Sequence, residues 1–339
     1  MKKFTTKDLK NLIFETVNES PRRNSRSNEL KAVIKEAQSV LFEKANPEDV
    51  DPTRFPLKLS DSGKFKGDKA DQRATGGADD GDASDDIVNT KPGGKSVKSL
   101  KPSQSSMNIH KALCFALAAV MKMPPFTAGP GGDLGAIITS DNHIMDGHHR
   151  WIASGMVDPN AEVGGVIVEF PAKQMIAALN MVTVHLTGRQ EGKPGSGGFD
   201  QFNEAGILAV LTDFAANGAS IPGKGAWEGI GPDVVKQACE TFAGTTGDGA
   251  VAAAAKKFAE NAAELTLSVP DGFPARPDMP VISKGEGHLD QAIELLQQGK
   301  VDLNEPYANE EASEEINDGV KRSNNVILER WTKLAGLIK

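Results

Sequence analysis

The chain has 339 residues, enough for two domains of ordinary size. Only 39% of the residues are hydrophobic, below the ~45–50% of a typical globular domain, so we expect part of the chain to lie outside a packed core. With only two cysteines, the chain has neither a disulfide framework nor a cysteine-based zinc site. No apolar run is long enough to span a membrane. The net charge of -8 disfavours nonspecific wrapping of nucleic acid and remains compatible with a local basic groove.

Residues 1–45 predict an N-terminal segment of two amphipathic helices, over 6–19 and 28–45. Leu9, Leu12 and Ile13 recur at helical spacing and share one face of the first helix. The opening residues lack the apolar h-region of a secretory signal, so we predict no such signal.

Residues 46–95 predict a flexible, acidic and glycine-rich linker. The stretch 60–95 contains eight Asp, seven Gly and few large apolar side chains. Such a composition buries too little surface to offset the entropy of ordering the chain. The sequence DDGDASDD (79–86) lacks the ligand spacing of an EF-hand loop, so a solvated linker is favoured over a calcium site.

Residues 96–190 alternate strand and helix patterns, which predicts a compact α+β domain. The predicted strands are 96–100, 134–140, 143–147 and 162–170, and the predicted helices are 107–123, 148–156 and 171–186. A glycine-rich loop at 188–200 leads into 201–339, which we predict to be a helical domain. Its helices are expected near 202–217, 231–244, 249–265, 285–299 and 310–338.

One short segment concentrates residues that bind anions. It spans 144–151 and reads Ile144-Met145-Asp146-Gly147-His148-His149-Arg150-Trp151. A strand is expected to deliver Asp146 and Gly147 to a helix beginning near His148, where free backbone N–H groups and the positive end of the helix dipole attract a phosphate. Gly147 lets the phosphate approach the backbone, and His148, His149 and Arg150 add donors. The alternative is a capping turn with surface histidines.

A metal site is not predicted. His148 and His149 are adjacent and would point about 100° apart on a helix, so they cannot chelate one ion as histidines four residues apart do. His143 has no second ligand at a useful spacing.

The DGHHRW sequence after a predicted hairpin resembles the phosphate-binding box of the ParB/sulfiredoxin superfamily, and in particular the D-G-H-H-R box of the archaeal free-serine kinases. Some phage proteins of the "ParB-like nuclease" type also combine LKPSQ (100–104) with this box. The resemblance covers roughly residues 95–186. It implies a nucleotide, ATP or another NTP, whose phosphates lie on Gly147, His148, His149 and Arg150.

The resemblance also implies contacts of Ser103 and Gln104 with the base or ribose, although both residues suit a cap of the helix that follows. In the kinase-like branch a carboxylate activates the acceptor hydroxyl, and Asp133 and Asp146 are the candidates. His148 occupies the position of the sulfiredoxin cysteine, so sulfinic-acid reduction is not expected. No helix-turn-helix pattern follows the box, which argues against sequence-specific DNA clamping.

The first 20 residues resemble the lysine-led leaders of internal head proteins of T4-like phages. Ile13-Phe14-Glu15 fits the pattern that prohead proteases cut, and an ordinary amphipathic helix is the competing interpretation. These two resemblances imply a phage protein of the host cytoplasm or the phage head, with other virion proteins or a second copy as partners. The lack of a long apolar run predicts no membrane association.

Three functions compete on these grounds. The leading one is NTP-dependent phosphoryl transfer or NTP hydrolysis, in which His148, His149 and Arg150 neutralise phosphate charge and Mg²⁺ bridges the phosphates. The second is a non-enzymatic, virion-associated protein that keeps the fold as a binding module. The third is a DNA nuclease, against which the acidic balance of the chain argues.

Overall fold

The computed structural model describes residues 45–47, 50–52, 57–59, 86–187, 195, 197–280 and 288–303. The fold is α+β, as predicted. The described residues belong to two compact units, and the second carries the candidate site. The first unit takes its residues from 1–88, 177–190 and 282–339, and the second from 89–176 and 191–281.

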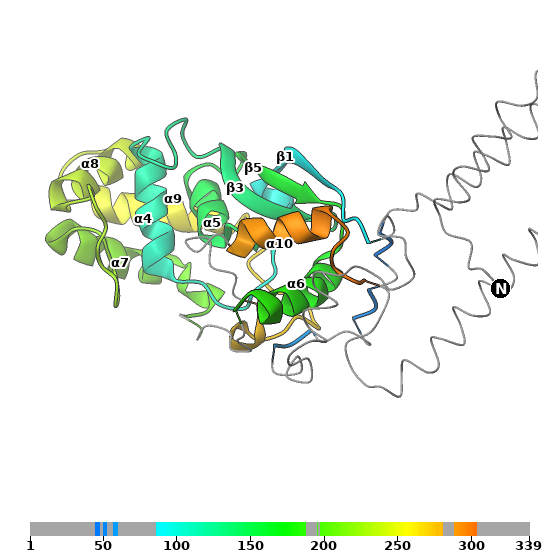
Figure 1. Ribbon diagram of the computed structural model, residues 1–339. Helices are drawn as coiled ribbons and strands as arrows, with labels where there is room; N and C mark the ends of the chain where they lie inside the picture. Colours follow the sequence, from blue (N-terminus) through cyan, green and yellow to red (C-terminus); the bar gives the residue numbers. More distant parts are fainter. Residues whose placement is uncertain are drawn as a thin grey trace, which may run out of the picture. The chain divides into compact units, whose positions relative to one another are not determined.

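A five-stranded mixed sheet forms one end of the second unit (Figure 1). Its strands lie in the order β1-β5-β3-β4-β2, with β3 parallel to β5, β2 parallel to β4, and the other pairs antiparallel. The strands are β1 (Thr90–Ser96), β2 (Lys101–Pro102), β3 (Gly132–Thr139), β4 (His143–Asp146) and β5 (Glu162–Val168).

The edge strand β1 corrects the sequence prediction at the end of the linker. Residues 90–95 pair with β5, with Gly93 opposite Gly165 and Gly94 opposite Gly164, whereas residues 97–99 form a 3-10 helix instead of the predicted strand. The sequence TKPGGKS has no alternating apolar pattern. It forms a strand because β5 supplies the hydrogen-bonding partners, and Pro92, which lacks an N–H, is tolerated on an edge.

Helices of the second unit pack against the sheet and against one another. They are α4 (Ile109–Val120), α5 (His148–Val157), α7 (Glu204–Asn217), α8 (Pro232–Ala243) and α9 (Ala250–Ala262), together with the short hairpin β6 (Ser220–Ile221) and β7 (Gly225–Ala226). These helices lie where the sequence predicts them, since each carries apolar residues at helical spacing. Figure 1 shows α4, α5 and α9 between the strands and the pair α7 and α8.

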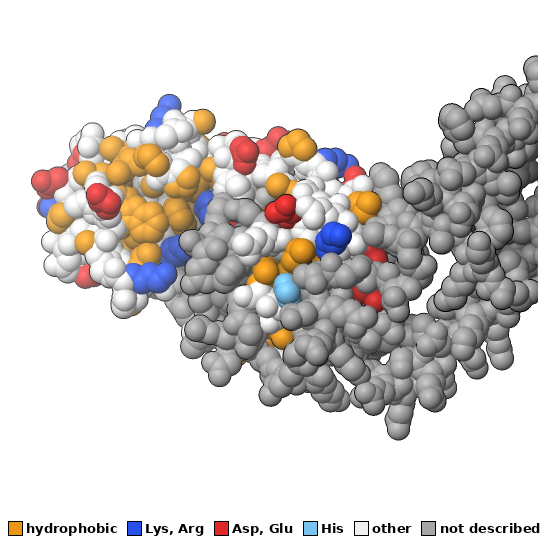
Figure 2. All heavy atoms as spheres, in the orientation of Figure 1, with side chains coloured by type: hydrophobic (Ala, Val, Ile, Leu, Met, Phe, Trp, Pro, Cys, Tyr) orange, Lys and Arg blue, Asp and Glu red, His pale blue; other side chains and the backbone are white. Residues whose placement is uncertain are grey.

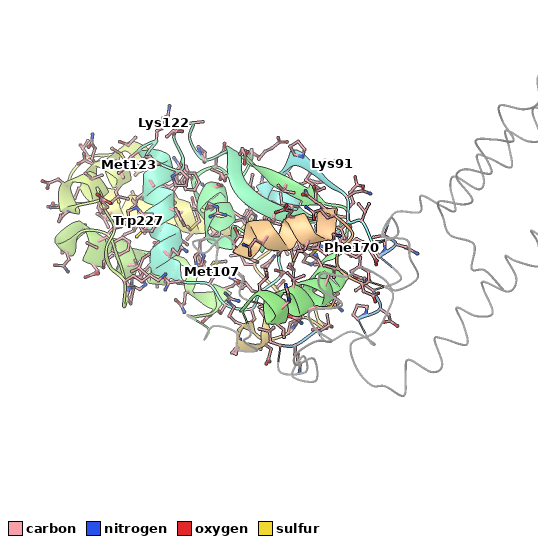
Figure 3. The ribbon with its side chains drawn as sticks, viewed as in Figure 1. Lys91, Met107, Lys122, Met123, Phe170 and Trp227 are labelled. Carbon is pink, nitrogen blue, oxygen red and sulfur yellow. The ribbon has the colours of Figure 1, made fainter. Side chains whose placement is uncertain are left out.

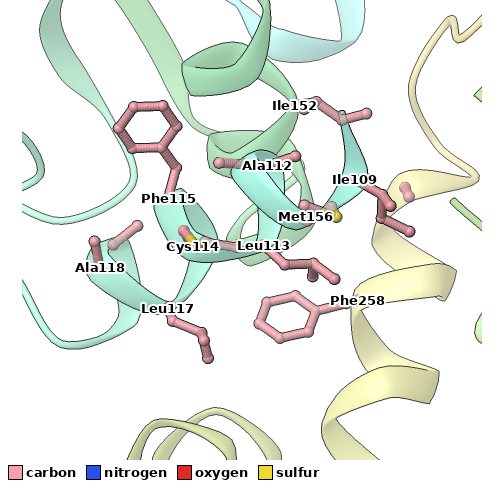
Figure 4. Close-up of a cluster of buried hydrophobic side chains, with 14 of the residues drawn as sticks. Ile109, Ala112, Leu113, Cys114, Phe115, Leu117, Ala118, Ile152, Met156 and Phe258 are labelled. Atoms are coloured by element: carbon pink, nitrogen blue, oxygen red, sulfur yellow. The ribbon is translucent and has the colours of Figure 1, made fainter. Parts of the chain in front are cut away.

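The core between α4, α5 and α9 is continuous with the core under the sheet. Leu113 of α4, Ile152 and Met156 of α5 and Phe258 of α9 are fully buried and belong to one apolar cluster (Figure 4). Asn261 of α9 donates its side-chain N–H to the carbonyl of Met156 at 2.7 Å, so α9 also satisfies the end of α5.

The continuous core changes the predicted domain division. We predicted a nucleotide-binding domain over 96–190 and a separate helical domain over 201–339. The structure instead places the sheet and the helices α7–α9 in one unit, because their apolar faces are buried against each other. The division falls within α6 (Ala172–Thr187), whose residues from Ala177 onward belong to the first unit.

The first unit contains α10 (His288–Gln297), within the predicted helix 285–299. The backbone N–H of Val88 donates to the carbonyl of Leu296 at 3.0 Å, and Asp86 accepts from the N–H of Leu303 at 2.8 Å. Asp86 is completely buried, so this last residue of the DDGDASDD run is a structural acceptor rather than a solvated charge. The predicted helices 6–19, 28–45 and 310–338, the DDGDASDD residues 79–85 and most of the predicted linker lie outside the described residues.

An apolar patch lies on the second unit beside α4. The rings of Phe115 and Trp227 meet edge-on at 4.9 Å, and Met123 lies close to Gly229 of the loop that follows the hairpin. Figure 3 labels Met123 and Trp227, and Figure 2 shows apolar side chains gathered over this face. Within the described residues, no helix has the length and apolar character needed to cross a membrane.

Candidate functional site

The junction between β4 and α5 has the predicted form. β4 ends at Asp146, α5 begins at His148, and Gly147 between them is the N-cap residue, with a left-handed φ of +95°. A Cβ on residue 147 would stand 3.3 Å from the Cα of Ala136 on β3, so both the backbone conformation and the close approach favour glycine.

Three backbone N–H groups at this junction lack helical acceptors. The carbonyl of Gly147 accepts the first helical hydrogen bond, from the N–H of Trp151 at 2.9 Å. The N–H groups of residues 148–150 therefore have no partner inside the helix, and the cap residue provides no side-chain acceptor. The positive end of the helix dipole adds to the attraction of these groups for an anion.

His148 faces inward from the first position of α5. Its Nε2 accepts a hydrogen bond from the backbone N–H of Ser103 at 3.2 Å, and the Ser103 hydroxyl lies 3.3 Å away. An accepting Nε2 carries no proton, so the ring is neutral, with its proton on Nδ1. Burial lowers the pKa of His148 to about 3. The charge of Asp146 opposes this shift, and the smaller effects of Arg276 and Arg150 add to it.

His149 makes a parallel contact with the next part of the same loop. Its Nε2 accepts from the backbone N–H of Asn108 at 3.2 Å. Burial, followed by the charge of Lys111, holds the pKa of His149 well below its usual value. The two imidazoles therefore fasten residues 103–108 to the start of α5. This corrects our expectation that they supply positive charge to a phosphate.

Arg150 forms hydrogen bonds with residues of β3 and β4. Its Nη2 donates to Asp146 Oδ2 at 2.7 Å and to the carbonyl of Gly135 at 3.2 Å. The side chain is 18% exposed, and its Nε is buried without an acceptor in the described part of the chain. Asp146 and Arg150 are four residues apart, so the last residue of β4 and the first turn of α5 form an ion pair across Gly147. Arg150 contacts a phosphate only if this pair is shared or rearranged.

Ser103 and Gln104 lie in the loop before α4 but do not cap that helix. The cap is Asn108, whose side chain accepts from the N–H of Lys111 at 2.9 Å. Ser103 is completely buried and its hydroxyl donates to the carbonyl of Ile144 at 2.7 Å, so it is not exposed to a base or ribose. Gln104 is 8% exposed and donates to the carbonyl of Ser106.

Asp133 is exposed near the start of β3, where its Oδ1 accepts from the N–H of Gly135 at 2.9 Å. The partner of Asp146 in the β3–β4 register is Ile137, four residues further along β3. A bulge in β3 lies between these residues, so Asp133 is opposite Gly164 and Ile137 is opposite Val166, and Asp133 is roughly 7 Å along the sheet from that point. The structure places Asp146 at the junction and Asp133 away from it.

Two cations from elsewhere in the chain affect the electrostatics of the histidines of the box. Lys111, in the first turn of α4, contributes to lowering the pKa of His149. Arg276, in the 3-10 helix Arg276–Asp278, contributes to lowering the pKa of both histidines. Sequence reasoning missed Arg276, because it lies far along the chain in a proline-rich stretch that reads as a turn. Its immediate neighbours, Ala275 and Pro277, give no local signal of a binding site.

His143 lies on β4 before the box. Its Nδ1 is 3.1 Å from Asp141 Oδ2, and its ring packs against Phe273 with the ring centres 4.9 Å apart. Across the part of the chain that the structure describes, no three side chains of His, Cys, Asp or Glu are grouped as metal ligands.

Comparison with known proteins gives no match: no protein-family model, curated protein or solved structure corresponds to this chain. The fold and the geometry of the junction therefore define its class, an α+β protein with a candidate anion-binding site at the start of α5.

Proposed function

We propose that the chain binds a nucleotide through its phosphates at the start of α5 and uses it in NTP-dependent phosphoryl transfer or NTP hydrolysis. The observation that carries this proposal is the set of three N–H groups at residues 148–150 without helical acceptors. The resemblance of DGHHR to the phosphate box of the ParB/sulfiredoxin superfamily supports the same ligand.

The roles of the box residues follow from their contacts. Gly147 brings the backbone close to the phosphate, and the N–H groups of residues 148–150 donate to its oxygens. The neutral imidazoles of His148 and His149 hold the neighbouring loop in place. Asp146 is the carboxylate at the junction, so it is the better placed of the two candidate proton acceptors.

Magnesium fits this site only as an ion shared with the substrate. Carboxylate oxygens suit the ion, and Asp133 and Asp146 each have one oxygen outside the contacts described above. In the described part of the chain, no third His, Cys, Asp or Glu side chain is grouped with them as a metal ligand. A bound magnesium ion would supply charge neutralisation on the phosphates, with Asp146, at the junction, as the carboxylate best placed to be a protein ligand.

The test is a calorimetric titration of the full chain with ATP, other nucleoside triphosphates and inorganic phosphate, with and without Mg²⁺, followed by product analysis. We expect binding by the wild type. Asp146→Asn removes a negative charge beside the phosphate, so its affinity should rise roughly three- to tenfold while turnover is lost. Asp213→Asn, an exposed carboxylate on α7, is the matched control. Absence of binding by the wild type at millimolar ligand would refute the proposal.

A non-enzymatic binding module is the second candidate, and one observation favours it. The side chains of His148, His149 and Arg150 all make contacts that hold the fold together. The box could therefore be retained for structure alone in a virion-associated protein. Product analysis separates the two candidates: binding without turnover in the presence of Mg²⁺ and acceptor hydroxyls supports the module.

A further inference from the structure

The apolar patch beside α4 comes from two segments that are far apart in the sequence. The first follows the end of α4 and contains Met123, which is partly exposed, and Pro124 and Pro125, which are exposed. The second is the β6–β7 hairpin with the loop after it, which contains the partly exposed Trp227. Figure 2 shows apolar side chains gathered on this face, and Figure 3 labels Met123 and Trp227 there. An exposed apolar patch with charges around it is typical of a surface that contacts another protein.

The patch has a fixed shape because its aromatic side chains pack into the core of the second unit. The rings of Trp227 and Phe115 meet edge-on with their centres 4.9 Å apart, and Phe115 meets Phe126 at 5.8 Å. The backbone N–H of Trp227 donates to the carbonyl of Ala219 at 2.7 Å, which holds the chain after the hairpin in place. A surface that is ordered before binding loses little conformational entropy when a partner covers it.

Lys122, on the border of the patch, has a backbone conformation that favours glycine. Its φ is +54°, in the left-handed region where a Cβ is crowded. Its N–H donates to the carbonyl of Ala119 at 3.3 Å, and the N–H of Met123 donates to that of Ala118 at 2.8 Å, so α4 ends in a motif that usually has glycine at this position. The Lys122 side chain is exposed and forms no ion pair within the described residues. The fold therefore gives no reason for a lysine at this position, whereas a contact outside the chain does.

Glu228 places the opposite charge on the same border. It is exposed and, like Lys122, forms no ion pair with any residue that the structure describes. Glu228 precedes Gly229, and a Cβ at residue 229 would stand 3.0 Å from the Cε of Met123. Lys122 precedes Met123 in the chain, so both charges lie close to Met123. This end of the border therefore carries one unpaired charge of each sign.

We propose that a second copy of the chain covers the apolar patch across a two-fold axis, and that Lys122 of each copy pairs with Glu228 of the other. A partner with charge of a single sign would face either Lys122 or Glu228 with a like charge, whereas a two-fold axis near Met123 brings each charge opposite its counterpart. Two further cations lie near the patch, Lys111 in the first turn of α4, with its Nζ 5.8 Å from the Phe115 ring centre, and Lys224 in the hairpin turn. Like charges oppose a contact centred on either of these, which also favours an axis near Met123. This inference does not depend on nucleotide binding.

The experiment is sedimentation equilibrium of the full-length chain across a wide range of micromolar concentrations. We expect the wild type to show a monomer–dimer equilibrium. Glu228→Lys and Lys122→Glu each put like charges across the axis, so each should raise the dissociation constant of the dimer at least about tenfold. The double variant exchanges the two charges and should dimerise like the wild type. Glu162→Lys, the same change of charge at an exposed position of β5, is the control and should also dimerise like the wild type.

A second measurement distinguishes a contact residue from a structural one. Lys122→Gly relieves the left-handed backbone, so the thermal midpoint of the monomer should equal or exceed that of the wild type, while dimerisation should weaken. A lower midpoint would show that the Lys122 side chain stabilises the fold, and would overturn its assignment to the contact. A wild type that stays monomeric at every concentration would overturn the proposal. So would a dimer that Glu228→Lys and Lys122→Glu leave unchanged, because the copies would then meet through another surface. Assemblies larger than a dimer would exclude the closed two-fold contact.

Discussion

Acid should destabilise this protein through His148, beginning at a pH above the ordinary titration range of its carboxylates. The folded ring is neutral because its Nε2 accepts the N–H of Ser103 inside the protein, and its pKa is about 3, whereas an unfolded histidine has the usual value of 6.5. Between these values the unfolded chain binds a proton that the folded chain does not. Stability therefore rises with pH across this window and is lost as pH falls from about 6.5 toward 3.

The magnitude follows from the two pKa values. One pKa unit corresponds to about 1.4 kcal/mol, so at pH 5 the 1.5 units below the unfolded value of 6.5 give a loss of about 2 kcal/mol from His148. His149 acts in the same direction, since its pKa is also well below the usual value. A loss of this size is a large fraction of the ~5–15 kcal/mol that stabilises a typical domain.

Urea denaturation at pH 7.5 and pH 5.0 measures this effect. His148→Gln keeps an acceptor for the N–H of Ser103 but cannot take up a proton, so its loss between the two pH values should be smaller than that of the wild type by about 2 kcal/mol. His110→Gln, on α4 outside the box, should retain the wild-type loss. A His148→Gln protein that loses as much stability as the wild type would refute the assignment of a neutral, accepting His148.

Three further substitutions test the local structure by thermal or urea unfolding. Gly147→Val should cost at least about 1–2 kcal/mol, because residue 147 has a φ of +95°, and Gly147→Asn should cost less. Gly165→Ala should be more damaging, since its Cβ would overlap a backbone carbonyl of β3 and force the β3–β5 pairing to shift. In the control Gly249→Ala the added Cβ meets open space, so stability should change by less than about 1 kcal/mol. Equal losses of stability in these two variants would contradict the close approach of β3 and β5 at Gly165. Trp151→Phe should cost about 1–3 kcal/mol, because it leaves the buried carbonyl of Val97 without the indole N–H that lies 2.9 Å away; an unchanged unfolding midpoint would mean that this hydrogen bond contributes nothing.

The sequence by itself determined the features that depend on near neighbours along the chain. Helices α4 and α7–α9 are visible as apolar residues at helical spacing, since a helix buries one face and its hydrogen bonds are local. The junction of β4 and α5 is visible as well, because Gly147 marks the change of backbone direction within a few residues. The α+β class follows from the alternation of such patterns.

Only the tertiary structure decided the features that depend on distant partners. The strand β1 has no apolar alternation and exists because β5 pairs with it. The protonation state of His148 depends on burial and on the N–H of Ser103, which the sheet brings against α5. Residues 270–280 lie against β4 because the ring of Phe273 packs on His143, which comes much earlier in the chain. Residue types showed where an anion could bind, whereas charge at the site depends on desolvation and on contacts between residues far apart in the chain.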